Sequence, residues 1–377
     1  MRLTLDRIAP TGEAVGRAES GLVVFVPFGL PGEEVEVRLV HRRRHFARAR
    51  LLRVLRPSPD RVVPLCPHFA NCGGCDWQHI AYDAQVRFKT EIVREQFARM
   101  GGIRDAPVRP CLPSPQPYGY RNRIQLVSAG EGRLGYRARH SHQVVPIAAC
   151  PIAAPEINAW LRTHPPGDTS ELVDLRLFNE GVQCAQPGMG GHCSVGAWTY
   201  FVPGEAFFQV NAAVASTLIR EVLRALALTG QEHVLDLYCG VGLFTRPIAE
   251  RARLTWGVES NPRAASAARQ NLRGLTANVI AADVEAALQR ATLRSIRWDA
   301  VVLDPPRAGM TREALQHLIA LSCSRIVYVS CDPATLARDA RSLLQAGYQL
   351  VEVQPLDMFP QTRHVESVAL FRLAGTP

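Results

Sequence analysis

Two kinds of segment are missing from this sequence of 377 residues. No apolar stretch follows the opening MRLTLDRIAP, and no run of about eighteen apolar residues occurs anywhere, which removes support for secretion and for a membrane-spanning helix. A hydrophobic content of 47% is enough for a sizeable core, and the length favours two or three domains. We therefore expect a monomeric protein of the cytoplasm with no membrane partner.

Lysine is almost absent as well. Lys89 is the single lysine, so every other residue in the count of 43 Lys+Arg is an arginine. The formal net charge of +9 suits a polyanionic partner, because basic side chains contact phosphates and release counterions. The arginine bias itself fits a GC-rich genome and phosphate recognition equally well.

A secreted disulfide framework is not indicated, although the chain has ten cysteines. Three of them, Cys66, Cys72 and Cys75, lie in CPHFANCGGC, where the glycines permit a backbone tight enough to bring thiolates around one metal centre. A fourth ligand must come from elsewhere, and Cys111 is the candidate by spacing. The residue types suit an iron–sulfur cluster or a structural Zn²⁺.

Residues 1–56 show apolar positions at every second residue, as in GEAVGRAESGLVVFVPFGLPGEEVEVRLV, and this pattern predicts a small OB-like β-barrel. The following HRRRHFARARLLRVL places Arg48 and Arg50 on one strand face, which fits either an RNA-binding surface or a solvated edge strand.

The rest of the chain divides into two further units. Residues 57–205 hold the cluster of three cysteines, a helix over 81–100 that we expect to pack on the last unit, and then β-like and turn-rich sequence, which together predict an α+β domain. In residues 206–377 strand and helix patterns alternate, which predicts a Rossmann-like, doubly wound α/β domain. Its expected strands are HVLDLYCG, LTWGVES, ANVIAAD, WDAVVLDPP and RIVYVSCD.

A glycine-containing turn in the last unit predicts a nucleoside-binding site. Gly240 and Gly242 lie between a strand and a helix, and Glu259 ends the next strand, where a carboxylate can accept two ribose hydroxyls. Thr245 occupies the third glycine position of the dinucleotide fingerprint, which makes NAD the minor interpretation. Asp283 closes the third strand and is either a contact to adenine or the N-cap of a helix.

A second strand end carries a candidate nucleophile, Cys331. Asp332 and Pro333 follow it at once, which predicts an N-cap and the first position of a helix. The positive end of that helix is expected to lower the thiol pKa by about one unit, which Asp332 opposes. The alternative is a buried structural cysteine.

Four segments, DLYCGVGLF at 236–244, LDPPRAG at 303–309, VSCDP at 329–333 and TRHVESVAL at 362–370, closely resemble the RNA uracil-5 methyltransferase family. The resemblance implies that Cys331 adds to uracil C6, that S-adenosylmethionine gives the methyl group, and that Glu366 removes the C5 proton. It also implies cofactor contacts by Gln209, Tyr238, Glu259 and Asp304, which we expect together with those of Gly240 and Asp283 in the nucleoside-binding site. His364 is two residues before Glu366, which favours a supporting role on the other face of a strand.

The N-terminal pattern resembles the TRAM domain, an RNA-binding barrel. Members of the family that carry this barrel and modify 23S rRNA hold a [4Fe–4S] cluster, which implies Cys66, Cys72, Cys75 and Cys150 as its ligands. A structural zinc is the alternative cofactor. Ribosomal RNA is accordingly the expected partner, and tRNA is the alternative substrate.

Further RNA contacts are expected from PYGYRNRIQLV, where Tyr120, Arg121 and Arg123 combine stacking and phosphate pairing; an amphipathic strand is the alternative. A noncatalytic RNA-binding or assembly factor that keeps a methyltransferase fold is the competing function.

Overall fold

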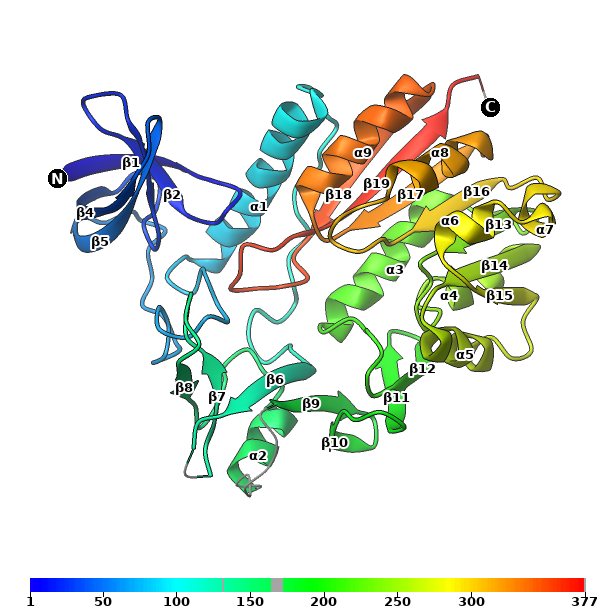
Figure 1. Ribbon diagram of the computed structural model, residues 1–377, viewed down its shortest axis with the longest axis horizontal. Coiled ribbons are helices and arrows are strands. Elements are labelled where there is room, and N and C mark those ends of the chain that lie inside the picture. The colour runs from blue at the N-terminus through cyan, green and yellow to red at the C-terminus, as the bar shows by residue number, and fades with distance from the viewer. Residues whose placement is uncertain (131, 164–171, 376–377) are drawn as a thin grey trace.

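The computed structural model describes residues 1–130, 132–163 and 172–375. Its N-terminal strands close into a barrel in the order β1-β2-β3-β5-β4, so the small barrel predicted from the sequence is confirmed (Figure 1). Along β5, Ala47 and Ala49 point into the core while Arg48 and Arg50 are exposed, because successive side chains of a strand point to opposite faces. The strands are β1 (Arg2–Ile8), β2 (Ala14–Arg17), β3 (Val23–Val26), β4 (Glu34–Arg42) and β5 (Phe46–Arg56).

A long helix leads from the barrel to a second sheet. Helix α1 (Tyr82–Gln96) continues into a π-helical turn, η1 (Phe97–Gly101), and stops at Gly102, whose φ of 70° only glycine adopts without strain. The second sheet is antiparallel and has the order β10-β9-β6-β7-β8, with α2 (Pro155–Thr163) packed on one face. Its strands are β6 (Arg123–Ser128), β7 (Leu134–Arg137), β8 (Val144–Pro146), β9 (Leu172–Phe178) and β10 (Gly181–Cys184). A hairpin of β11 (Gly190–Val195) and β12 (Trp198–Pro203) follows.

The largest sheet has seven strands in the order β15-β14-β13-β16-β17-β19-β18. Five of them are parallel, and β19 runs antiparallel to both of its neighbours. The parallel strands coincide with the five stretches expected from the sequence. They are β13 (His233–Leu237), β14 (Leu254–Glu259), β15 (Ala277–Ala281), β16 (Ala300–Leu303) and β17 (Arg325–Ser330), and the last two strands of the sheet are β18 (Tyr348–Leu356) and β19 (Glu366–Leu373).

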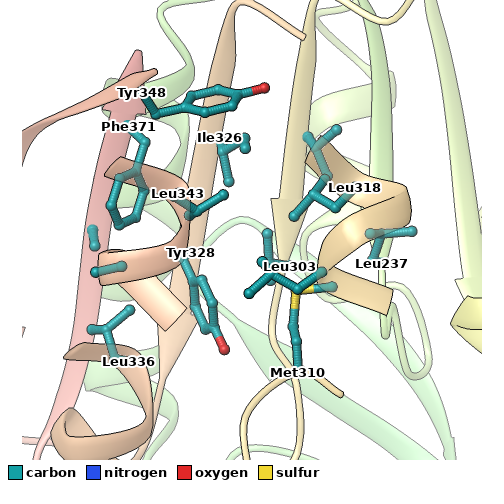
Figure 2. Close-up of a cluster of buried hydrophobic side chains, with 14 of the residues drawn as sticks. Leu237, Leu303, Met310, Leu318, Ile326, Tyr328, Leu336, Leu343, Tyr348 and Phe371 are labelled. Atoms are coloured by element: carbon teal, nitrogen blue, oxygen red, sulfur yellow. The ribbon is translucent and has the colours of Figure 1, made fainter. Parts of the chain in front are cut away.

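Helices cover both faces of this sheet (Figure 1), as a doubly wound fold requires. One face packs against α3 (Ala212–Leu226), α4 (Thr245–Ala249) and α5 (Pro262–Asn271). The other packs against α6 (Val284–Leu288), α7 (Ala291–Arg294), α8 (Arg312–Ala320) and α9 (Pro333–Gln345). Figure 2 shows part of the second core, in which Tyr328 and Ile326 of β17 meet Leu336 and Leu343 of α9.

Helix α1 extends the second layer, although it lies far away in the sequence. Val93 and Phe97 are fully buried in the same core as Leu336 and Ala337 of α9, and α1 and α9 run side by side in Figure 1. Burial of a Phe or Val side chain contributes roughly 1.5–3 kcal/mol, so this contact holds the helix firmly on the large sheet.

Within the part of the chain that the structure describes, every helix is too short or too polar to cross a lipid bilayer.

Candidate functional site

The turn after β13 opens the sheet edge where a ligand can approach. Tyr238, Gly240 and Gly242 all have positive φ, of 63°, 56° and 92°, so the chain bends sharply between β13 and α4. A Cβ added at Gly240 would meet nothing within 4 Å among the described residues, so the space beside this glycine is open. A ligand can therefore contact the backbone directly.

Two carboxylates of the parallel strands flank this turn. Glu259 accepts the Gly240 amide at 2.9 Å and the Asn261 amide at 2.7 Å, which leaves further lone pairs for ligand hydroxyls. Asp236 is fully buried and accepts the Thr245 hydroxyl at 2.5 Å through Oδ2, but its Oδ1 has no partner in the described part of the molecule. Burial raises the pKa of Asp236 to about 7, with further contributions from Asp304 and Glu259.

The other residues expected to contact a cofactor differ in their positions. Gln209 is buried, and its backbone carbonyl accepts the side-chain amide of Asn122 at 3.1 Å. Asp304 follows β16 directly, and burial raises its pKa to about 7. Asp283 is exposed at the N-cap position of α6, yet its side chain makes no capping hydrogen bond to that helix within the described chain. The geometry thus leaves the Asp283 carboxylate available to a ligand.

Cys331 and Glu366 lie next to each other at the carboxyl edge of the sheet. Strands β17 and β19 are antiparallel neighbours whose register pairs Ser330 with Ser367, so the two candidates occupy the next pair of positions. Glu366 is 2% exposed, and its Oε1 has no hydrogen-bond partner among residues 1–130, 132–163 and 172–375. Burial, followed by the charge of Asp304, raises the pKa of Glu366 well above its usual range.

The predicted helix start after Cys331 is confirmed, because Asp332 accepts the amides of Ala334 and Thr335 and Pro333 is the first helical residue. The expected lowering of the Cys331 pKa is wrong. Burial raises that pKa to about 12, and the charges of Glu366 and Asp304 add to the effect. The Asp332 carboxylate already occupies the free amides of the first turn, which weakens the field that the helix would offer the thiol.

A cavity of about 300 Å³ opens beside Cys331. Its walls come from distant parts of the chain: Pro10 and Thr11 of the barrel, Arg307 after β16, and His364 before β19. Because His364 precedes the strand, the expected alternation of strand faces does not apply to it. Burial lowers the pKa of His364 to about 4, so it is neutral at physiological pH.

The four cysteines expected to bind a metal centre line one cavity of about 430 Å³ in the central domain. Cys111 lies elsewhere, in the core beneath the large sheet. No group of three or more His, Cys, Asp or Glu side chains is placed to share one metal ion in the described portion of the chain. The structure therefore brings Cys66, Cys72, Cys75 and Cys150 to one cavity and does not show a formed metal centre.

The three side chains expected to contact RNA all make internal contacts. Tyr120 is 6% exposed, and its hydroxyl donates to the Pro360 carbonyl at 3.0 Å, which removes the ring from the surface and corrects its expected stacking role. Arg123 forms a paired contact with Asp174, at 2.9 Å and 2.6 Å, and Arg121 donates to the Arg123 carbonyl at 2.9 Å. The alternative, an amphipathic strand, holds only from Arg123 onward, where β6 begins, and RNA contact by Arg121 and Arg123 stays a prediction.

Sequence reasoning missed two features of the site. Arg307 was only part of a motif, yet its side chain lines the same cavity as Cys331, and its charge favours the thiolate of that residue. Asp76, next to Cys75, accepts both Arg139 at 2.9 Å and Arg363 at 3.2 Å, which ties the cysteine loop to the segment before Glu366. The position of Arg307, three residues after Asp304, could have indicated its place in the site. The contact between Asp76 and Arg363 joins segments about 290 residues apart, and no local pattern reveals it.

A parallel sheet with an antiparallel final pair, a glycine turn after one strand and a carboxylate at the end of the next define a Rossmann-like methyltransferase fold joined to a small barrel. The sequence model of the tRNA (Uracil-5-)-methyltransferase family matches residues 195–373, and that of the TRAM domain matches residues 1–52.

Full-length relatives agree with these matches. The 23S rRNA (uracil(1939)-C(5))-methyltransferase RlmD of Edwardsiella ictaluri is 36% identical, over 97% of this chain and 94% of its own. An uncharacterized RNA methyltransferase of Nitratidesulfovibrio vulgaris is 35% identical, over 98% and 95%. The chain belongs to the RNA (uracil-5-)-methyltransferase family, so it is an enzyme of EC class 2.1.1, and the family resemblance drawn from its motifs is confirmed.

A solved structure gives the same result in three dimensions. The tRNA (uracil-54, C5)-methyltransferase of Pyrococcus abyssi, in complex with S-adenosyl-L-homocysteine, superposes with a TM-score of 0.76 at 26% identity, covering 98% of this chain and 100% of its own. The barrel and the methyltransferase fold expected from the sequence are thereby confirmed.

Proposed function

We propose that this enzyme methylates C5 of a uridine in 23S rRNA, with Cys331 as the nucleophile and Glu366 as the base. The observation that carries the proposal is the adjacency of these two side chains at the sheet edge that also holds the glycine turn. The ribosomal substrate is favoured by the relatives that carry the name RlmD. Transfer RNA is the second candidate, favoured by the likeness to the Pyrococcus abyssi enzyme.

S-adenosylmethionine is the proposed methyl donor, and the residues present fit it. Among the described residues, Gly240 has open space at its α-carbon and Oδ1 of Asp236 has no partner, so that it can accept a hydrogen bond. Glu259 ends β14, where ribose hydroxyls bind in such folds. Gln209, Tyr238, Asp283 and Asp304 complete the proposed contacts. When bound, this cofactor supplies an electrophilic methyl group on a sulfonium.

The chain's own residues supply the rest of the chemistry. The Cys331 thiol loses its proton to water and its sulfur adds to uracil C6, while the π electrons of the C5–C6 bond move into an enolate at O4, so that C5 becomes nucleophilic. Once C5 carries the methyl group, Glu366 takes the C5 proton. The electron pair of that C–H bond restores the double bond as the C6–S bond breaks, and the thiolate leaves. A buried carboxylate with a raised pKa suits this last step, because it is a stronger base than an exposed one.

The central domain is proposed to hold a [4Fe–4S] cluster through Cys66, Cys72, Cys75 and Cys150. Four sulfurs bound to a single zinc at about 2.3 Å lie within about 4 Å of one another, whereas a cluster spreads its ligands more widely. Among the described residues these thiols line one cavity of about 430 Å³ but do not gather around a single point, and such an arrangement suits the larger group better. Structural zinc remains the alternative. The group would fix the loop of residues 66–75, and no catalytic step depends on it.

The domains divide the work in this proposal. Residues 1–56 form the RNA-binding barrel, residues 57–205 the cluster domain, and residues 206–377 the methyltransferase. One chain carries every proposed site residue, so a monomer suffices. Because Pro10 and Thr11 line the cavity beside Cys331, the barrel is proposed to contact RNA close to the target base.

The test uses RNA that contains 5-fluorouridine, because fluorine at C5 cannot leave as a proton and the adduct persists. With S-adenosylmethionine present, the wild-type enzyme is expected to form a covalent complex with a 23S rRNA fragment. Cys331→Ala abolishes the complex, whereas Cys184→Ala, on β10 and outside the site, retains it. Adduct formation in the Cys331→Ala variant would sink the assignment.

Two other outcomes separate the competing functions. A complex formed only with tRNA transfers the proposal to that substrate. Tight RNA binding with no transfer of labelled methyl to any cellular RNA would support a noncatalytic assembly factor.

A further inference from the structure

Arg307 lies in the loop that follows β16, three residues after Asp304, and its side chain lines the cavity beside Cys331. Cys331 lines the same cavity, so the guanidinium and the thiol face one shared space. Arg307 is exposed, so its side chain does not fill a core among the described residues. A charged side chain of this kind beside a nucleophile calls for a functional explanation.

The loop that carries Arg307 is fastened to α9, the helix that begins just after Cys331. Thr335 donates its hydroxyl to the Arg307 carbonyl at 3.2 Å, and Arg338 donates to the Ala308 carbonyl at 2.9 Å. Asp339 accepts the Met310 amide at 2.9 Å. Between these anchors, a Cβ at Gly309 would come within 3.0 Å of both the Arg338 and Asp339 side chains. The nucleophile and the arginine are therefore held by one helix.

Charges reach the Cys331 sulfur from several elements. Glu366 at the start of β19 and Asp304, directly after β16, disfavour the thiolate, and the positive charge of Arg307 favours it. Of the other charged or titratable side chains around the cavity, Asp332 is turned to its own helix amides, Arg363 is paired with Asp76, and His364 is neutral. Arg307 is the positive group that directly opposes the two carboxylates.

We propose that Arg307 is a further catalytic residue, whose guanidinium stabilises the Cys331 thiolate before it attacks the pyrimidine and accepts it again when the product is released. This inference rests on the proposed function. During attack the sulfur lone pair becomes the S–C6 bond and the negative charge moves to O4, so the contact to Arg307 weakens. During elimination the same pair returns to sulfur, and the contact forms again. The arginine thus lowers the barrier at both ends of the covalent stage.

The test measures the thiol itself, without RNA or cofactor. The full-length protein is treated with iodoacetamide between pH 6 and pH 10, roughly spanning the usual thiol range, and carbamidomethylation of the Cys331 peptide is followed by mass spectrometry. Because only the thiolate reacts, Arg307→Met is expected to slow the reaction about tenfold at every pH well below the thiol pKa, which corresponds to a pKa one unit higher. Arg307→Lys keeps a point charge without the planar fork and is expected to fall between the two.

Arg312→Met is the matched control, because Arg312 is exposed at the start of α8 and lies outside the cavity. Equal rate profiles for wild type, Arg307→Met and Arg312→Met would overturn the inference. If Arg312→Met slowed alkylation as much as Arg307→Met does, the inference would also be overturned, because the loss of any positive charge would then explain the slower reaction.

A second readout separates this inference from the proposed function. With 5-fluorouridine RNA and S-adenosylmethionine, Arg307→Met is expected to form the adduct about tenfold more slowly than wild type, with RNA affinity unchanged. Failure of the wild type to form any adduct would reject the uridine chemistry and leave the alkylation result standing. A normal wild-type adduct with an unaltered alkylation profile in Arg307→Met would reject only the role of Arg307.

Discussion

Lys89, the single lysine of the chain, donates to Asp357 at 2.5 Å, and both side chains are completely buried. The ammonium also donates to the Phe359 carbonyl at 3.0 Å. This pair joins α1 to the segment between β18 and Glu366, so it links the helix after the cysteine loop to the chain that carries the proposed base. A compact ammonium with three donors fits this enclosed position, where a planar guanidinium needs more room.

Removing one partner of this pair should cost much stability. We expect Lys89→Met to lower the free energy of unfolding by about 3–5 kcal/mol, because the Asp357 charge is left buried without compensation. Urea denaturation followed by circular dichroism measures the change. The double variant Lys89→Met/Asp357→Asn should recover most of the loss. Additive losses in the double variant would show that the two groups are not coupled.

The proposed base should act late and should depend on pH in one direction. Glu366→Gln is expected to allow addition and methylation but to accumulate the covalent RNA complex. In the wild type only the ionised carboxylate accepts the C5 proton, and its pKa is raised well above the usual range. Release of the adduct should therefore slow as the pH falls through that raised pKa. Rapid-quench gels at several pH values measure it. Unchanged release in Glu366→Gln would return the residue to a structural role.

Asp236 makes stability itself depend on pH. Its pKa is raised in the folded state to about 7 from 3.8, so the folded protein holds this proton more tightly than the unfolded chain does. The associated stability is present below about pH 4 and is lost as the pH rises to about 7. Each tenfold change in proton affinity corresponds to about 1.4 kcal/mol, so the free energy of unfolding should fall by a few kcal/mol over this range. Thermal unfolding across this range should show the loss in wild type and much less of it in Asp236→Asn. Identical slopes would contradict the assignment.

Local patterns were enough to predict the parts of this molecule that depend on neighbours in sequence. Strand alternation gave the barrel and the five parallel strands, and Asp332-Pro333 gave the start of α9. Local patterns failed where distant segments meet. The hydroxyl of Tyr120 is bound by the distant Pro360 carbonyl, which the sequence pattern does not reveal. The fold also buries the thiol of Cys331, and β19 places Glu366 beside it, so that its pKa rises where the sequence predicted a lower one.

The cysteine cavity yields a chemical prediction. Protein prepared without oxygen should contain about four irons and show the broad visible absorption of an iron–sulfur cluster. Serine at Cys66, Cys72, Cys75 or Cys150 should remove most of the iron. Cys111→Ser is the control, because that buried thiol lies in a different core and should leave the metal content unchanged. One zinc per chain and no iron would favour the alternative cofactor.

Substitution of Arg50 should affect RNA affinity, whereas substitution of Arg123 should affect protein stability. Arg50 is exposed on β5, directly opposite Arg38 on β4, and two like charges facing each other across strands weaken a sheet unless an anion binds there. Arg123 is paired with Asp174 inside the central domain. We therefore expect Arg50 to bind RNA and Arg123 to stabilise the central domain.

Arg50→Ala should weaken RNA binding and reduce the slope of log affinity against log salt by about 0.7–0.9, with the free energy of unfolding changed by less than about 0.5 kcal/mol. Arg123→Ala should lower the free energy of unfolding by about 1–3 kcal/mol, because Asp174 loses its positively charged partner, and should keep the salt slope of the wild type. Filter binding between 50 and 200 mM salt, roughly the range in which phosphate contacts dominate, measures the slope, and urea denaturation measures stability. A lower slope in Arg123→Ala with unchanged stability would restore that residue to the RNA surface and reverse the division between the two arginines.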